Sequence, residues 1–209
     1  MAFDGMVVAN LTSDFSQKLT GGKISKIAQP EKDELLFTIK NNKETYRLQI
    51  SASASLPFIY FTENNKPSPL TAPNFCMLLR KHIGSARILK VSQPGLERII
   101  EFELEHLDEM GDLCRKRLIV ELMGKHSNII FCKEDGTILD SIKHVSAQVS
   151  SVREVLPGRT YFIPHTTEKE DPLTITEEAF RQGLCAWVEK KQPSASSRAD
   201  YNQHGKEDH

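Results

Sequence analysis

Glu97 and Arg98 stand side by side at a turn, in the stretch QPGLERIIEFELEH of residues 93–106. A carboxylate and a guanidinium placed in this way can pair with each other, which is worth at most about 1 kcal/mol on an exposed surface. The guanidinium can instead present its planar fork of five donors to another group. The two residues alone favour an ordinary exposed pair, so the surrounding sequence has to decide between these roles.

Charge is unevenly spread around this turn. The chain has a net charge of -1, which by itself predicts no partner. Residues 71–100, however, hold five Lys or Arg against one acid, and residues 101–112 hold six acids and no Lys or Arg. A local basic surface of this kind could meet phosphates, although charge alone favours a solvated charged face.

Much of the turn's context occurs twice in the chain. The aligned pairs are Lys23 and Arg87, Ile24 and Ile88, Lys26 and Lys90, Ile27 and Val91, Gln29 and Gln93, Pro30 and Pro94, and Asp33 and Glu97. This repetition predicts an internal duplication. The first copy has Glu34 where the second has Arg98, so we expect the two turns to differ in task.

Each copy predicts a helix, a strand, a turn and a second strand. Apolar residues at helical spacing predict a first helix over roughly residues 5–19, which the following glycines end. A second helix has Thr71 as its predicted N-cap, Pro73 in its first turn and Gly84 as its stop. Its core-facing stripe consists of Phe75, Leu78, Leu79 and His82.

The remaining elements complete a mixed fold. Proline donates no ladder hydrogen bond, so Gln-Pro is expected to break the strand in each copy. Further strands are predicted near residues 45–50, 58–62, 117–122, 128–132 and 137–140. The sequence therefore predicts an α+β domain, with a β-sandwich or barrel flanked by helices and built by internal duplication.

Composition excludes several classes of protein. The 209 residues, of which 39% are hydrophobic, suit one domain with a short extension. No apolar run is long enough to cross a bilayer and the N-terminal stretch has no basic region, so a cytoplasmic protein without a membrane partner is expected. Four scattered cysteines predict reduced thiols, with neither zinc nor disulfides: Cys76, Cys114, Cys132 and Cys185.

The C-terminal part of the chain changes character. Residues 169–191 predict a polar linker and a short helix, with an N-cap at Thr174 or Thr176. Residues 192–209 have almost no apolar content and are expected to be disordered. The expected organisation is a folded domain over residues 1–168, the linker and helix, and then a tail or the end of a piece of a larger protein.

Six motifs occur in one order over residues 3–164. They are FDGMVVANL, FCMLLRKHI, the Glu-Arg turn, GDLCRKRLIVELMGKHSNIIF, DSIKHVS and LPGRTYFIP. Together they resemble the N-terminal domain of the NFACT family, whose bacterial members are also called RqcH or fibronectin-binding proteins. The resemblance implies a fold related to the N-terminal domain of Fpg-type DNA glycosylases. Residues 170–209 do not convincingly supply the helix-hairpin-helix, coiled-coil and NFACT-R regions that follow in the family.

The resemblance also implies a function in ribosome quality control. Family members bind the large ribosomal subunit with peptidyl-tRNA, recruit alanyl-tRNA and support alanine tailing of the stalled chain. An Asp-Arg pair in their N-terminal domain is needed to hold tRNA. Glu97 and Arg98 match this pair, with an acid that is one methylene longer. Arginine suits single-stranded RNA loops, and phosphate contacts are expected from Arg80, Lys81, Arg87 and Lys90.

Three further residues are candidates for RNA contact. Lys125 and His126 begin a segment that follows an apolar run and a glycine, which predicts a turn between strands. His126 can read RNA or satisfy backbone groups, and the structural role is favoured for the neighbouring Asn128. Lys143 in DSIKHVS can reach a phosphate or simply form a charged strand end.

Other functions remain as alternatives. An Fpg-type lyase uses an N-terminal proline followed by a glutamate, whereas this chain begins Met1-Ala2-Phe3 and has no catalytic motif. A non-enzyme without cofactor or metal is therefore expected, and Fpg-like DNA binding without glycosylase activity is one alternative. A fibronectin-binding surface adhesin is another, following the family's older label. The module could also serve only to stabilise a parent protein.

Overall fold

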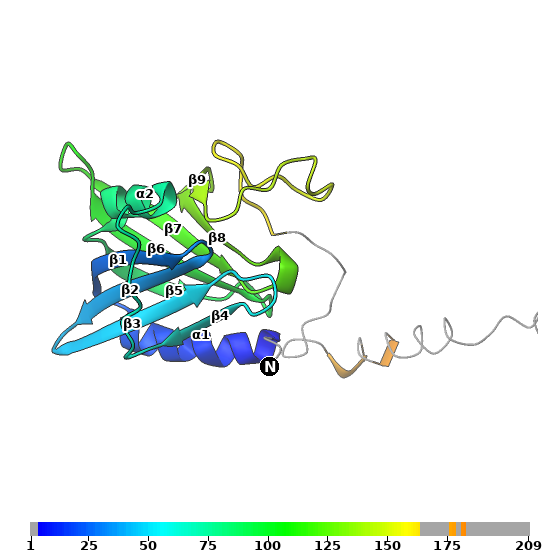
Figure 1. Cartoon of the computed structure of the whole chain (residues 1–209). Coiled ribbons are helices and arrows are strands. Elements are labelled where there is room, and N and C mark those ends of the chain that lie inside the picture. The colour runs from blue at the N-terminus through cyan, green and yellow to red at the C-terminus, as the bar shows by residue number, and fades with distance from the viewer. Residues whose placement is uncertain (1–3, 164–175, 179–180, 183–209) are drawn as a thin grey trace, which may run out of the picture. The chain divides into compact units, whose positions relative to one another are not determined.

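The computed structural model describes residues 4–163, 176–178 and 181–182. Residues 4–163 form helices α1 (Gly5–Leu19) and α2 (Asn74–Ile83), a short 3₁₀ helix η1 (Gly124–His126) and one sheet in the order β4-β3-β2-β1-β5-β6-β7-β8-β9. The strands are β1 (Lys23–Glu31), β2 (Glu34–Asn41), β3 (Glu44–Ser51), β4 (Phe58–Phe61), β5 (Arg87–Ser92), β6 (Ile99–Leu107), β7 (Leu113–Glu121), β8 (Asn128–Lys133) and β9 (Ile138–Ser141). The predicted α+β class is confirmed, with α2 and α1 on opposite sides of the strands in Figure 1.

The predicted duplication is visible at the centre of the sheet, where β1 meets β5 antiparallel with Lys23 opposite Arg87. Two backbone bonds of 2.9 Å flank this pair, from Ile24 N to the Ala86 oxygen and from Ile88 N to the Gly22 oxygen. Exchanging the two copies exchanges these two bonds. The repeat therefore generates a pseudo-two-fold axis that passes between β1 and β5.

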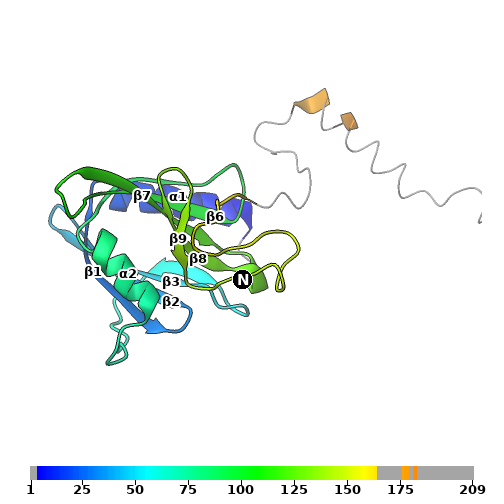
Figure 2. The ribbon, with the colours of Figure 1, turned by 90° about the horizontal axis from the view of Figure 1, so that it is seen from above.

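The two copies also share a strand irregularity and exchange their helices. Register shifts fall between Ile24 and Lys26 in β1 and between Ile88 and Lys90 in β5, which are matching positions. Helix α1 packs against β5, whereas α2 packs against β1, and Figure 2 shows α2 beside β1. Since each helix covers a strand of the other copy, the two halves share one core and form a single folding unit.

The first helix begins where its sequence provides a cap. The Asp4 side chain accepts a 2.8 Å hydrogen bond from Val7 N, which satisfies one of the free amides of the first turn. Val8, Phe15 and Leu19 then fall on the buried face of α1. The prediction of a helix over residues 5–19 is confirmed.

Two boundary predictions are wrong. Helix α2 has Pro73 as its N-cap and no side-chain cap, so Thr71 does not cap it. The reason is that proline disfavours helical backbone in the residue before it. Strand β1 continues through Pro30 to Glu31 and is not broken there. Its register shifts between Ala28 and Glu31, so Pro30 lies where the ladder needs no donor. In the second copy β5 does end before Gln-Pro.

A second apolar cluster attaches the end of the described domain to the second half of the sheet. Ile99, Ile119 and Ile130 pack there with Val155 and the partly buried Tyr161. Glu121 at the end of β7 is fully buried and accepts hydrogen bonds from Arg153 and from the Tyr161 hydroxyl. This network fixes residues 153–161 to the sheet.

Three of the four cysteines lie in the described part of the chain, and none of these three forms a disulfide there. Cys76, Cys114 and Cys132 are free, and burial raises the pKa of the Cys132 thiol to about 12, so this thiol stays protonated. Cys185 lies outside the described residues. None of the helices that the structure describes is long and apolar enough to span a bilayer.

Little of the predicted C-terminal organisation falls on described residues. Residues 177, 178, 181 and 182 are helical, and Arg181 pairs with Glu177 at 2.7 Å. The predicted boundaries at residues 168 and 191 and the expected tail lie outside the described residues.

Candidate nucleic-acid interface

The turn of residues 93–98 is fastened to the start of α1 by one side chain. Gln93 Nε2 donates to the Gly5 oxygen at 2.9 Å and to the Glu97 oxygen at 2.7 Å. A further bond of 3.1 Å from Glu97 N to the Pro94 oxygen closes the turn. Because three bonds define its backbone, the turn presents its last residues from a fixed position.

Arg98 and Glu97 do not use each other as partners. Arg98 is exposed and Glu97 is half-buried, and no ion pair joins them. Among the residues that the structure describes, neither side chain makes a hydrogen bond or an ion pair, although the Arg98 carbonyl accepts a 2.8 Å bond from Leu122 N. The arrangement therefore leaves the guanidinium available to an external group.

In the matching turn of the first copy, the charged side chain already has partners within the protein. Glu34 occupies the position of Arg98, and its carboxylate accepts a 2.7 Å bond from Lys66 and a 3.1 Å bond from Gln49. Gln29 nevertheless closes this turn as Gln93 closes the second, by a 3.0 Å bond from its Nε2 to the Lys32 oxygen. The duplication thus kept the turn and changed the side chain that the turn presents.

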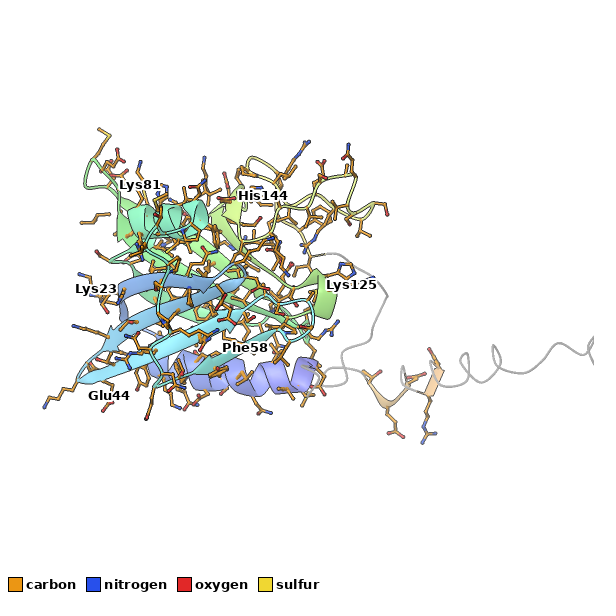
Figure 3. The ribbon with its side chains drawn as sticks, viewed as in Figure 1. Lys23, Glu44, Phe58, Lys81, Lys125 and His144 are labelled. Carbon is orange, nitrogen blue, oxygen red and sulfur yellow. The ribbon has the colours of Figure 1, made fainter. Side chains whose placement is uncertain are left out.

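Lys125 and His126 lie at the same end of the sheet as Arg98. Both are exposed on η1, which begins three residues after β7 ends at Glu121. Glu121 is the register partner of Ile99, the residue after Arg98. The predicted turn between strands is confirmed, and Figure 3 shows Lys125 at this end of the domain.

Lys143 also lies at this end, but its amine points inward. Its Nζ donates to the Ala52 oxygen and, at 3.2 Å, to the Ser127 oxygen. Burial lowers the pKa of this amine. Asn128 is buried and bonds the backbone of Lys143 through both atoms of its amide, which confirms its structural role. Lys143 thus stabilises the end of η1 through its bond to Ser127, the residue that follows this helix.

The other four predicted cations lie away from the turn. Arg80 donates through Nε to the Ile27 oxygen at 2.8 Å. Lys81 pairs with Glu109 at 3.0 Å and Lys90 with Glu103 at 3.5 Å. Arg87 begins β5 and lies opposite Glu105, near the far end of β6.

Arg87 and Lys81 are separated from the turn of residues 93–98 by most of the length of β6. The nine residues of β6 span roughly 27 Å, at about 3.4 Å per residue. Figure 3 shows Lys81 and Lys125 at different ends of the domain. The structure therefore brings together Glu97, Arg98, Lys125, His126 and Lys143, and it places Arg80, Lys81, Arg87 and Lys90 outside this group.

Sequence reasoning missed the residue that positions the site. Gln93 was recognised only as part of a repeat, yet it connects the turn to α1. The repeated Gln-Pro was a sufficient signal in principle, because a side-chain amide beside a turn can bond backbone groups within it. Its second bond, to Gly5, depends on the tertiary structure and carried no signal in the sequence.

Comparison with known proteins gives one family. Residues 4–196 match the model of the NFACT N-terminal and middle domains. The chain is 40% identical over 179 residues to the Rqc2 homolog RqcH of Bacillus subtilis, a match that covers 85% of this chain and 31% of that protein. It is 23% identical over 163 residues to the human ribosome quality control complex subunit NEMF, covering 78% of this chain and 14% of NEMF.

Two solved structures are similar over most of the chain. The N-terminal part of the fibronectin/fibrinogen-binding protein of Streptococcus suis superposes with a TM-score of 0.82 at 37% identity, covering 88% of this chain and 69% of that one. The N-terminal domain of the fibronectin-binding protein PavA of Streptococcus pneumoniae gives a TM-score of 0.80 at 33% identity, covering 95% and 73%. The chain spans under a third of the length of the curated relatives that it matches.

Proposed function

The chain belongs to the family of NFACT N-terminal and middle domains, and from this membership we propose that it is the RNA-binding module of a bacterial ribosome quality control factor. It binds tRNA, with alanyl-tRNA as the expected ligand, and the large ribosomal subunit that carries peptidyl-tRNA. In this role the module supports alanine tailing of the stalled chain in the cytoplasm and performs no catalysis itself. The names of the relatives RqcH and NEMF support the assignment to ribosome quality control.

One observation carries the RNA-binding role. Arg98 is exposed and has no partner among the described residues, although the same position in the first copy holds Glu34, which is paired with Lys66 at 2.7 Å. An unpaired arginine on a turn fixed by Gln93 is arranged to meet an external ligand. An arginine that was already paired within the protein would have to break that pair before it could bind.

The chemistry of the turn fits a looped RNA. A guanidinium can donate to the edge of an unstacked base or stack on its face. The Glu97 carboxylate, which does not pair with Arg98, can accept hydrogen bonds from a ribose hydroxyl or a base edge. Lys125 and His126 lie at the same end and can contact the phosphates of the same loop.

The test is tRNA binding by the 209-residue chain, measured by fluorescence anisotropy over a series of salt concentrations. Wild type is compared with Arg98→Ala and with the control Arg159→Ala, which removes the same charge from an exposed ion pair with Glu154. We expect Arg98→Ala to weaken binding by about 1 to 3 kcal/mol, as the loss of a specific arginine contact does. Arg159→Ala should leave the affinity within a factor of two.

Equal affinities for Arg98→Ala and wild type would remove Arg98 from the interface. Equal weakening by both variants would indicate a general charge effect. A duplex DNA competitor separates RNA recognition from the Fpg-like alternative, because duplex DNA should compete poorly with tRNA. We expect no base release from damaged duplex.

Fibronectin binding is the second candidate, and the names of the two structural neighbours favour it. The measurement is surface plasmon resonance on immobilised fibronectin. Saturable binding that is unaffected by competing tRNA and by Arg98→Ala would support a separate adhesive function. Binding that fails to saturate, or that tRNA abolishes, would count against it.

A further inference from the structure

We propose that a second phosphate-binding surface lies on the outer face of the central strands and binds the backbone of the same RNA that Arg98 contacts. It consists of Lys23, Lys26, Lys40, Arg87 and Lys90, which we call the central cationic strip. This inference rests on the proposed RNA-binding function and extends it to a surface at a distance from the turn of residues 93–98.

The register of the sheet brings these cations together. Lys23 on β1 is the partner of Lys40 on β2 and of Arg87 on β5, so three cations form one row across three adjacent strands. Neighbouring strands lie about 4.8 Å apart, and directly opposed side chains point to the same face. Figure 3 shows Lys23 projecting from the edge of the domain.

Lys26 and Lys90 form a second row on the same face. Lys26 is the register partner of Thr38, which is two positions from Lys40 on β2. Lys90 is the register partner of Glu103 on β6, and Arg87 is the register partner of Glu105. Glu103 and Glu105 are two positions apart on β6. Because side chains two positions apart on a strand share a face, both rows point outward together.

The described chain pairs only one of the five cations of this strip with an acid. All five side chains are exposed, and of the five only Lys90 has an ion pair within the described residues, to Glu103 at 3.5 Å. Glu105 lies opposite Arg87, but no ion pair joins them. Like charges placed directly opposite each other destabilise a sheet. An anionic ligand would convert this repulsion into attraction.

The internal duplication gives an independent argument. Both copies have cations at the two matched exposed positions, Lys23 with Arg87 and Lys26 with Lys90. The matched isoleucines Ile24 and Ile88 are explained by burial in the core, but packing gives no reason to keep exposed cations where they repel. The copies did diverge at the position of Arg98. A ligand shared across the pseudo-two-fold axis explains why the cations were kept.

The surface beside the strip suits a nucleic acid chain. A hollow of about 190 Å³ adjoins Lys26 and is lined by Thr38 and the loop of residues 65–68. It offers room for a ribose or a base next to the phosphates that the strip would hold. Along β5, Arg87 lies six residues and Lys90 three residues before Gln93, or roughly 20 Å and 10 Å, so one folded RNA can contact both the strip and the turn of residues 93–98.

The experiment measures tRNA affinity of the 209-residue chain against salt for the triple variant Lys23→Gln/Lys40→Gln/Arg87→Gln. Its control removes three exposed cations elsewhere, Arg115→Gln/Lys133→Gln/Arg159→Gln. We expect the strip variant to lose about 100- to 1000-fold in affinity near 0.1 M salt and to reduce the slope of log K against log salt by about 2 to 3, one unit per lost phosphate contact. The control should change neither quantity by more than the experimental error.

Three outcomes separate the proposals. If Arg98→Ala weakens tRNA binding but the strip variant behaves like the control, the proposed function stands and the strip is overturned. If wild type does not bind tRNA, both are overturned. If the strip variant loses binding to vesicles with 30% phosphatidylserine and keeps its tRNA affinity, the strip binds lipid and the RNA assignment is wrong. The thermal midpoint should be equal or higher in the strip variant, since repulsion is removed, which excludes unfolding as the cause.

Discussion

Gly5 lies so close to Leu96 that a Cβ atom at position 5 would be 2.2 Å from the Leu96 carbonyl oxygen. Real Cβ atoms essentially never come within 3.0 Å of such a neighbour. The glycine is needed because the backbones approach each other here, at the contact between α1 and the turn that presents Arg98. The FDGMVVANL motif and the Glu-Arg turn are thus two sides of one contact.

Gly5→Ala should loosen this contact. The methyl group has to displace either the start of α1 or the turn, and such overpacking costs about 1 to 3 kcal/mol. We expect a lower urea midpoint together with weaker tRNA binding, because Arg98 moves with its turn. The control is Asn10→Ala, an exposed position on α1, which should affect neither. Full affinity in a destabilised Gly5→Ala would show that the position of the turn does not matter.

The duplicated glutamines allow a matched comparison. Gln93→Ala removes two bonds to backbone carbonyls, and Gln29→Ala removes one; each bond is worth about 1 kcal/mol. Both variants should therefore be less stable in urea unfolding. Only Gln93→Ala should weaken tRNA binding, because only the second turn carries Arg98. Equal loss of affinity in both variants would point to general loosening of the sheet.

The buried ion pair of Arg153 and Glu121 should contribute most of the free energy that holds residues 153–163 on the sheet. Glu121 is fully buried, so Arg153→Met leaves a carboxylate without its charged partner, which costs about 3 to 5 kcal/mol. Arg159→Met disrupts an exposed pair of 2.8 Å with Glu154 and should cost less than about 1 kcal/mol. Chemical denaturation measures both. Similar small losses would mean that water reaches Glu121 in the folded protein.

His82 should make stability depend on pH. Burial lowers its pKa, helped by Lys116, His106 and Lys81 and opposed by Glu109. Because the folded state disfavours the charged ring, the unfolded chain takes up the proton first as pH falls below about 6.5. The contribution of His82 is therefore complete above that pH and declines below it.

The check is urea unfolding at pH 7.5 and pH 5.5 for wild type and His82→Phe. Phenylalanine suits the site because the His82 ring already packs against the ring of Phe131, with 6.0 Å between the two ring centroids. Wild type should lose more stability between the two pH values than His82→Phe, whereas the exposed control His126→Phe should follow wild type. A steeper loss in His82→Phe would reverse the assigned sign.

Local patterns in the sequence were enough to predict the elements. The first helix follows from apolar spacing and the strands from short apolar runs between turn residues, which depend on neighbours within a few positions. The duplication was readable because the two copies still align. The difference between Glu34 and Arg98 identified the turn that merits a functional test. The break predicted at Pro30 failed because local rules do not record which backbone groups need partners, whereas the cap predicted at Thr71 overlooked the local effect of Pro73 on the residue before it.

The tertiary structure alone decided how the cations are used. Nothing in the sequence shows that Lys143 donates to Ala52, that Arg80 donates to Ile27, or that Lys23 lies opposite Arg87. Each relationship joins segments distant along the chain, and it depends on sheet register and helix placement. A charged residue type fixes what a side chain can bind, but only its neighbours in the folded protein determine whether that capacity is already satisfied.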